Sequence, residues 1–189
     1  MAKRVFFSFH YQDVIDFRAN VVRNHKTTKH VGAGYFDASI WEDAKKESDL
    51  ALKRLINNEL KNTSVTAVLI GSSTYSRRWV RYEILKSLKK GNLLLGIHIN
   101  SINGKDRRKK RLGPNPFEHL AVQFSNDGKR INLLEYKNGK WIKYKDLDGW
   151  NINSVNKSNW GKAYKLSRYY KVYDWVKNDG YNNFDKWIE

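Results

Sequence analysis

One acidic residue, Glu83, stands in a strongly basic segment where the sequence could support chemistry. Trp79 precedes it by four residues, so the two side chains would lie one turn apart on one side of a helix. The apolar run 65–70 comes just before, and open α/β sheets bind ligands at the carboxyl ends of such strands. A carboxylate there could stabilise positive charge on a bound molecule. The alternative, which spacing alone favours, is a solvated acid paired with a nearby cation: Arg81, Lys86 or Lys90.

The elements that would position Glu83 are predicted from the local pattern. Residues 65–70 are apolar and rich in β-branched types, which predicts a strand buried on both faces of a parallel sheet. Val80, Ile84 and Leu88 recur at four-residue spacing, which predicts a helix packed against that sheet. Four hydroxyl residues between strand and helix are candidate N-caps: Ser72, Ser73, Thr74 and Ser76.

A similar strand and helix are predicted at the start of the chain. Residues 5–9 form an apolar run, which predicts the first strand. Asp13 is then interpreted as the N-cap of a helix that continues to residue 22. The apolar positions of this helix are Val14, Phe17, Val21 and Val22.

The alternation continues and predicts a doubly wound, mostly parallel α/β sheet. A helix is expected over 43–61, and a buried strand over 93–99. The expected apolar stripe of that helix is Ala44, Leu50, Ala51, Leu55 and Ile56. Residues 31–36 are a Gly-rich turn or a short second strand, and Gly32 and Gly34 are too few for a dinucleotide-binding fingerprint.

The second half of the chain is less regular. Residues 100–116 form a connection with a basic run at 105–111, and 121–125 could form a last strand. Asn138 and Gly139 predict a β-hairpin over 133–144, because both residues tolerate positive φ angles. A helix is expected over 162–177 with Gly180 as its stop. We therefore predict a domain over 1–145 and an aromatic-rich helical extension over 146–189 packed on it.

Composition limits the function classes. The chain has 189 residues and no cysteine, which excludes disulfides and thiolate nucleophiles and predicts a cytoplasmic protein. No apolar segment is long enough to cross a membrane. The five histidines lack metal-ligand spacing, so no metal is expected. The net charge of +17 favours phosphate-bearing partners without choosing among them.

Two segments together resemble the Toll/interleukin-receptor (TIR) domain family. Residues 7–13, Phe-Ser-Phe-His-Tyr-Gln-Asp, resemble its first-strand box, and residues 76–83 resemble its Ser-x-x-Trp-x-x-x-Glu helix. Residues 69–74, 96–97 and 113–117 are similar to the bacterial branch that includes the sensor subunit of the Thoeris antiphage defence system. The likeness spans about residues 3–145. Val80 stands where many enzymatic members have cysteine, and residues 31–37 lack the proline-containing loop of signalling members.

The resemblance implies a flavodoxin-like TIR fold and an enzyme that cleaves NAD, releasing nicotinamide and making a cyclic ADP-ribose isomer as a second messenger. NAD is then the substrate and no cofactor is needed. It implies that Glu83 is catalytic and that Asp13 lies at the edge of the site. The implied substrate-binding residues are Ser8, Phe9, His10, Tyr11 and Trp79. The implied partner is an effector protein that the product activates, and self-association is a further option.

The chemistry of the implied reaction suits a single carboxylate. Nicotinamide leaves as a neutral molecule, so no proton donor is required, and Glu83 would stabilise the oxocarbenium-like transition state. In a dry pocket the ribosyl cation is captured by a group of the same molecule, which gives cyclisation, whereas capture by water gives hydrolysis. The sequence does not decide between the two.

Each candidate also has an ordinary structural interpretation. His10 is read as a loop histidine, Trp79 as a packing residue at a helix start, and Ser8 and Phe9 as ordinary strand residues. The basic run 105–111 is read as a solvated loop. Two other functions stay open: a non-enzymatic TIR-like interaction module and, least favoured, a basic nucleic-acid-binding protein.

Overall fold

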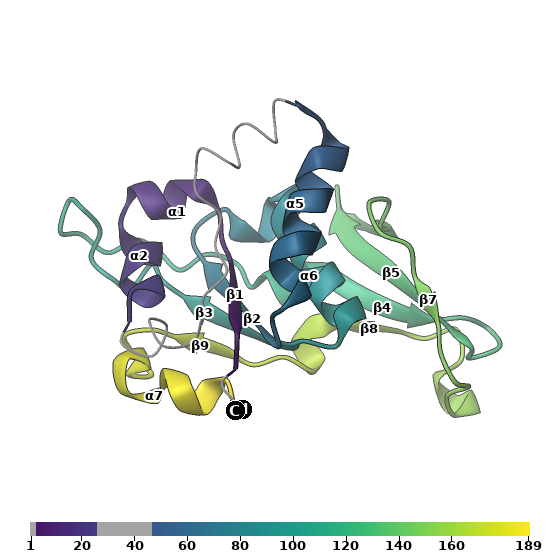
Figure 1. Ribbon diagram of the computed structural model, residues 1–189. Coiled ribbons are helices and arrows are strands. Elements are labelled where there is room, and N and C mark those ends of the chain that lie inside the picture. The colour runs from purple at the N-terminus through teal and green to yellow at the C-terminus, as the bar shows by residue number, and fades with distance from the viewer. Residues whose placement is uncertain (1–2, 26–46) are drawn as a thin grey trace.

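The computed structural model describes residues 3–25 and 47–189, which form two β-sheets with helices around them (Figure 1). Sheet A is parallel in the order β1-β2-β3-β9, and sheet B is antiparallel in the order β6-β5-β4-β8, with β7 paired to β5. The predicted α/β class with a mostly parallel sheet is therefore confirmed. Among the described residues, no helix combines the length and the apolar content that a membrane span requires.

The described elements have the following bounds. Sheet A consists of β1 (Val5–Ser8), β2 (Val65–Ile70), β3 (Leu93–His98) and β9 (Val172–Asp174). Sheet B consists of β4 (Leu120–Phe124), β5 (Arg130–Lys137), β6 (Lys140–Lys143), β7 (Trp150–Asn151) and β8 (Ala163–Lys165). The α-helices are α1 (Tyr11–Ile15), α2 (Arg18–Arg23), α5 (Asp49–Lys61), α6 (Arg78–Lys90) and α7 (Gly180–Trp187). Short 3-10 turns are η1 (Thr74–Ser76), η2 (Pro116–His119), η3 (Lys157–Asn159) and η4 (Leu166–Arg168).

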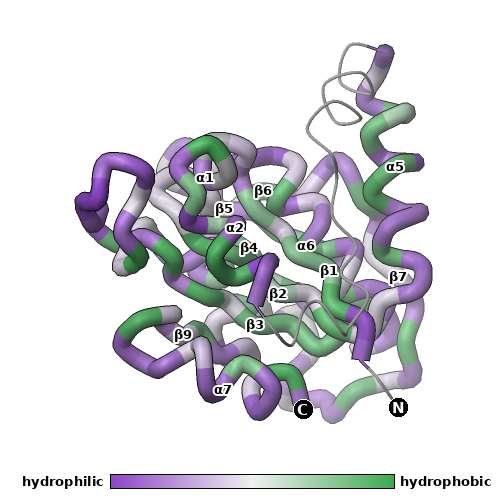
Figure 2. Tube along the Cα trace, turned by 60° about the vertical axis from the view of Figure 1, so that its left-hand side comes forward, coloured by the Kyte–Doolittle hydropathy of each residue, from purple (hydrophilic) through white to green (hydrophobic). Residues whose placement is uncertain are grey.

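Sheet A separates two hydrophobic clusters. On one face, Phe6 and Val68 pack with residues of α5 and α6. On the other face, Val5 and Phe7 pack with residues of α2 and α7. All six residues of β2 are buried, as the β-branched run predicts. Figure 2 shows hydrophobic colour along β1, β2 and β3 and hydrophilic colour along the projecting loops.

The predicted N-terminal helix is wrong in detail. It is split into α1 and α2 at Phe17, whose backbone is left-handed with φ 62°. Asp13 lies inside α1 and is buried, so it is not an N-cap, and Phe17 and Val21 are exposed. Arg18 explains the break, because its buried guanidinium donates to the carbonyls of Ile102 and Arg108. These tertiary bonds override the apolar periodicity of the segment.

Helix α5 confirms the helix expected up to residue 61. Its expected start at residue 43 and the Ala44 position lie outside the described residues. The same holds for the Gly-rich segment 31–36. The predicted stripe is shifted: Leu50 is exposed, and the buried positions are Leu52, Ile56 and Leu60. Ser48 caps the helix by accepting a hydrogen bond from the backbone N–H of Ala51.

Helix α6 confirms the predicted core stripe, because Val80 and Ile84 are buried and Leu88 packs against the same cluster. The predicted capping is wrong. The N-cap position is Arg77, which makes no capping bond with its side chain. Thr74 is instead buried and accepts a hydrogen bond from the backbone N–H of Gly71, which ties η1 to the end of β2.

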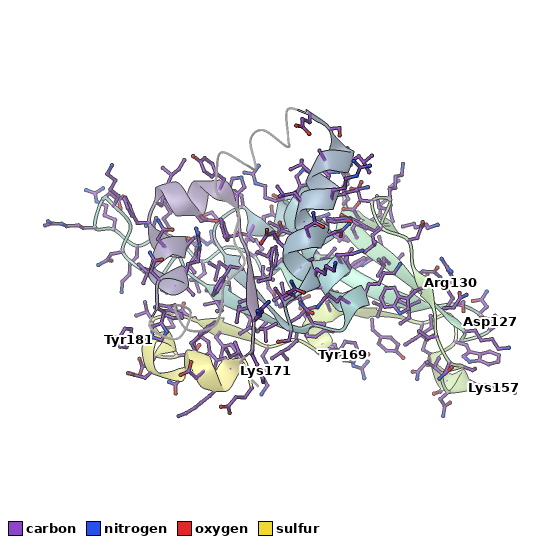
Figure 3. The ribbon with its side chains drawn as sticks, in the orientation of Figure 1. Asp127, Arg130, Lys157, Tyr169, Lys171 and Tyr181 are labelled. Carbon is purple, nitrogen blue, oxygen red and sulfur yellow. The ribbon has the colours of Figure 1, made fainter. Side chains whose placement is uncertain are left out.

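The hairpin prediction is confirmed, since β5 and β6 pair across Asn138 and Gly139, whose φ angles are 51° and 79°. The strand expected over 121–125 exists as β4, but it belongs to sheet B, between β5 and β8, and does not extend sheet A. Figure 3 shows Arg130 and Lys157 at the far end of sheet B and Tyr181 at α7, on the opposite side of the molecule.

The helix predicted over residues 162–177 is wrong. This segment forms β8, which pairs with β4, and β9, which pairs with β3. Val172 and Tyr173 are good strand formers, and β3 offers them an edge whose backbone groups need partners. Gly180 begins α7 instead of ending a helix. Residues 146–189 thus contribute strands to both sheets as well as α7.

Candidate active site

The structure brings Ser8 and Glu83 together at the carboxyl end of β1. Ser8 is the last residue of β1 and lies two positions after Phe6, on the face of sheet A that α6 covers. Its hydroxyl donates a hydrogen bond of 2.5 Å to Oε2 of Glu83 in α6. Ser8 is fully buried and Glu83 is 4% exposed. The pair is therefore a preformed polar contact inside the protein.

The environment of Glu83 changes its acid–base behaviour. Burial raises the pKa of the Glu83 carboxyl to about 8, and the hydrogen bond from Ser8 partly opposes that rise. The interpretation of Glu83 as a solvated acid is therefore wrong. Two of its candidate cationic partners bind elsewhere: Arg81 forms an ion pair with Glu135 at 2.5 Å, and Lys90 donates to the carbonyl of Thr63.

Asp13 is another buried carboxyl near the carboxyl edge of sheet A. Thr74 lies within 3.5 Å of its Oδ2, and an added Cβ at Gly71 would come 2.1 Å from its Oδ1. Burial raises the pKa of Asp13 to about 6, and the charge of Lys110 lowers it in part. Asp13 is thus packed against the turn that joins β2 to α6, which fits the predicted place at the edge of the site.

The aromatic candidates lie around this pair in different layers. Phe9 packs with the cluster on the other face of sheet A, and the guanidinium of Arg23 lies 5.0 Å from its ring centre. Trp79 packs with the cluster on the α6 side, with its ring 5.9 Å from that of Tyr82. The structure therefore does not gather Phe9 and Trp79 into one wall, and their roles in substrate binding stay predictions.

The remaining two candidates lie where β1 meets α1. The carbonyl of His10 accepts the backbone N–H of Asp13, which fixes the start of α1. Tyr11 is the first residue of α1 and is 41% exposed. Both follow Ser8 closely in the chain, so they lie at the same sheet edge, and their contact with substrate stays a prediction.

Sequence reasoning missed Asn100, which is fully buried just after β3. Its amide donates to the hydroxyl of Ser72 and to the carbonyl of Arg111, so it joins the ends of β2 and β3 to the basic loop. Its Oδ1 has no hydrogen-bond partner among the described residues. A polar residue directly after a buried strand was the available signal.

The arrangement can stabilise positive charge. A carboxyl with a pKa near 8 is mostly protonated at neutral pH, and a cationic ligand beside it would favour the carboxylate form. Ser8 would then hold the carboxylate in one orientation. Within residues 3–25 and 47–189 there is no cluster of three side chains that could hold a metal ion.

Comparison with known proteins gives two matches. Residues 6–103 match the family described as "Thoeris protein ThsB, TIR-like domain". The whole chain is 62% identical over 191 residues to a protein of Bacillus cereus (strain MSX-D12), and the match covers 100% of both chains. That relative is named "Putative cyclic ADP-D-ribose synthase ThsB1". The matched family region contains both Ser8 and Glu83.

Proposed function

Because the chain belongs to the ThsB family of TIR-like Thoeris proteins, we propose that it cleaves NAD and makes a cyclic ADP-ribose as a signal in antiphage defence. The observation that carries the proposal is the buried hydrogen bond between Ser8 and Glu83 at the carboxyl edge of a parallel sheet. The name of the Bacillus cereus relative supports the identity of the product.

The proposed mechanism uses Glu83 as the stabilising charge. The bond between the ribose and the nicotinamide breaks, its electron pair leaves with the nicotinamide, and the ribosyl carbon becomes cationic. The Glu83 carboxylate stabilises this cation, and Ser8 keeps the carboxylate oxygen oriented. The cationic nicotinamide of the substrate also favours ionisation of Glu83, whose pKa is about 8 without it.

Burial of the pair supports cyclisation over hydrolysis. Glu83 is only 4% exposed, so a ribosyl cation in contact with its carboxylate would lie in a site from which most water is excluded. A group of the same ADP-ribose is held close to the cation and captures it first, because an intramolecular reaction has a high effective concentration. Contacts of Phe9, His10, Tyr11 and Trp79 with the substrate belong to the same proposal, with Phe9 and Trp79 on different faces of sheet A.

The experiment compares purified wild type with Glu83→Gln in the presence of NAD. Nicotinamide and the cyclic product are separated by chromatography and identified by mass spectrometry. We expect Glu83→Gln to reduce product formation by at least about 100-fold, since it removes the stabilising charge. Glu118→Gln is the matched control, because Glu118 is exposed on η2 and should leave the rate unchanged. Equal rates for wild type and Glu83→Gln would reject the assignment.

The wider role is part of the same proposal. The cyclic product would activate an effector protein, which is expected to bind the product and not necessarily this chain. A cytoplasmic location fits a protein without cysteine that uses NAD. Self-association is tested by measuring the molecular mass in solution with and without NAD.

A further inference from the structure

A cleft of about 720 Å³ lies on the other side of α6 from the Ser8–Glu83 pair. It opens between the first turns of α6 and the β5–β6 hairpin, and its lining contains neither Ser8 nor Glu83. Arg81 lines it, two residues before Glu83, and two residues turn a helix by about 200°. The cleft is therefore a separate site, of a size that suits a small molecule.

One wall of the cleft is a row of flat rings from three different elements. The ring of His119 lies 4.8 Å from that of Tyr75 and 6.1 Å from that of Tyr136. Trp141, which does not line the cleft, lies behind Tyr136 with its ring centre at 5.5 Å. Burial and the charge of Arg81 lower the pKa of His119, so the imidazole is neutral at pH 7. Such a wall can stack against a nucleobase.

The two arginines of the cleft are paired with its two acids. Arg81 is paired with Glu135 at 2.5 Å, and Arg78 makes two hydrogen bonds to Asp146, at 2.8 and 2.7 Å. These pairs occupy both of its acids.

Two lysines of the cleft remain available to a ligand. Lys137 and Lys145 are exposed, and neither forms an ion pair in the part of the chain that the structure describes. The cleft therefore offers two ammonium groups to an anion, and Asn138 contributes to the same lining.

We propose that this cleft binds a nucleoside diphosphate, with the base stacked on the Tyr75–His119–Tyr136 wall and the phosphates held by Lys137 and Lys145. The rings alone would fit any flat molecule, and the lysines alone would fit any anion. A ligand with a flat base at one end and phosphates at the other satisfies both features. The site differs from the proposed NAD-cleaving site and does not depend on that activity.

The test measures ADP binding by calorimetry, with the Glu83→Gln variant as the host protein. ADP contains no nicotinamide bond to cleave, so binding is measured without turnover. We expect Lys137→Ala/Lys145→Ala to weaken ADP binding by at least about 10-fold, since two charge-assisted contacts are lost. The charge-matched control is Lys157→Ala/Lys171→Ala, two exposed lysines that Figure 3 shows at the lower side of the molecule.

Two further binding measurements distinguish the contribution of base stacking from that of the lysine charges. Tyr136→Ala should weaken ADP binding and leave pyrophosphate binding unchanged, because it removes only the ring. Pyrophosphate should bind more weakly than ADP. The proposal is overturned if ADP does not bind, if both lysine pairs weaken it equally, or if pyrophosphate binds as tightly as ADP. Thermal melting of each variant checks that the fold is retained.

Discussion

The hydroxyl of Ser8 donates its hydrogen bond to the carboxyl of Glu83 across 75 positions of sequence, at a distance of 2.5 Å. The contact joins the last residue of β1 to the second turn of α6, and both partners are buried. It holds the proposed catalytic acid in a place where its charge is costly without a cation nearby. This cost and the packing around the pair determine how the protein should respond to pH and to substitution.

The rate of NAD cleavage should depend on the ionisation of Glu83. Burial raises the pKa of this carboxyl from 4.5 to about 8, so the free enzyme gains the carboxylate as the pH rises through that value. We expect kcat/KM to rise with pH and to level off above about pH 9. Initial rates of nicotinamide release between about pH 5.5 and 9.5 measure this. A profile that is flat from about pH 6 would show that Glu83 is already ionised in the free protein.

Removing the Ser8 hydroxyl should move that profile. The hydrogen bond from Ser8 lowers the pKa of Glu83, so Ser8→Ala should raise the pKa and shift the midpoint of kcat/KM to higher pH. Ser8→Thr keeps a hydroxyl and should restore the midpoint in part. If Ser8→Ala lowers the rate equally at every pH, Ser8 contacts the substrate without tuning Glu83.

Glu83→Gln should stabilise the folded protein at alkaline pH. The pKa of Glu83 is raised on folding, so between pH 4.5 and about 8 the folded state binds more protons than the unfolded state. The free energy of unfolding of wild type therefore falls across this window, by up to about 1.4 kcal/mol per pH unit from this group. The melting temperature of Glu83→Gln relative to wild type should rise from about pH 5 to about pH 9. The exposed Glu118→Gln control should show no such trend.

Gly71→Ala should disturb the edge of the site. A Cβ at this position would come 2.1 Å from Oδ1 of Asp13, so the Asp13 side chain or the backbone must move. We expect a loss of about 1 to 3 kcal/mol of stability in chemical denaturation. In the background of Asp13→Ala, which removes the clashing oxygens, the same change should cost less. Equal costs in both backgrounds would mean that Asp13 is not the obstacle.

Local sequence patterns predicted those parts of the fold that local chemistry determines. The β-branched run of β2, the core stripe of α6 and the positive φ angles at Asn138 and Gly139 each follow from residue type and spacing. Glu83 could be singled out because residues 76–83 resemble the Ser-x-x-Trp-x-x-x-Glu helix of TIR domains. Its hydrogen bond to Ser8 could not be derived, since it depends on how α6 packs against β1.

Other features depended on distant contacts and were missed for that reason. Phe17 breaks the first helix because Arg18 is used to bind the carbonyls of Ile102 and Arg108. Val172 and Tyr173 form a strand because β3 is next to them. The cleft beside α6 combines residues from η1, η2, α6 and the β5–β6 hairpin, and no short sequence motif contains them together.

The pairing of β9 with β3 affects how the protein is made. About 75 residues separate the two strands in the sequence. When β1, β2 and β3 have been synthesised, the edge of β3 therefore stays unpaired until β9 emerges from the ribosome. The nascent chain must keep that edge from pairing with a neighbouring copy during this delay. Completion of the sheet is therefore a late event in biosynthesis, reached only when the C-terminal part of the chain has left the ribosome.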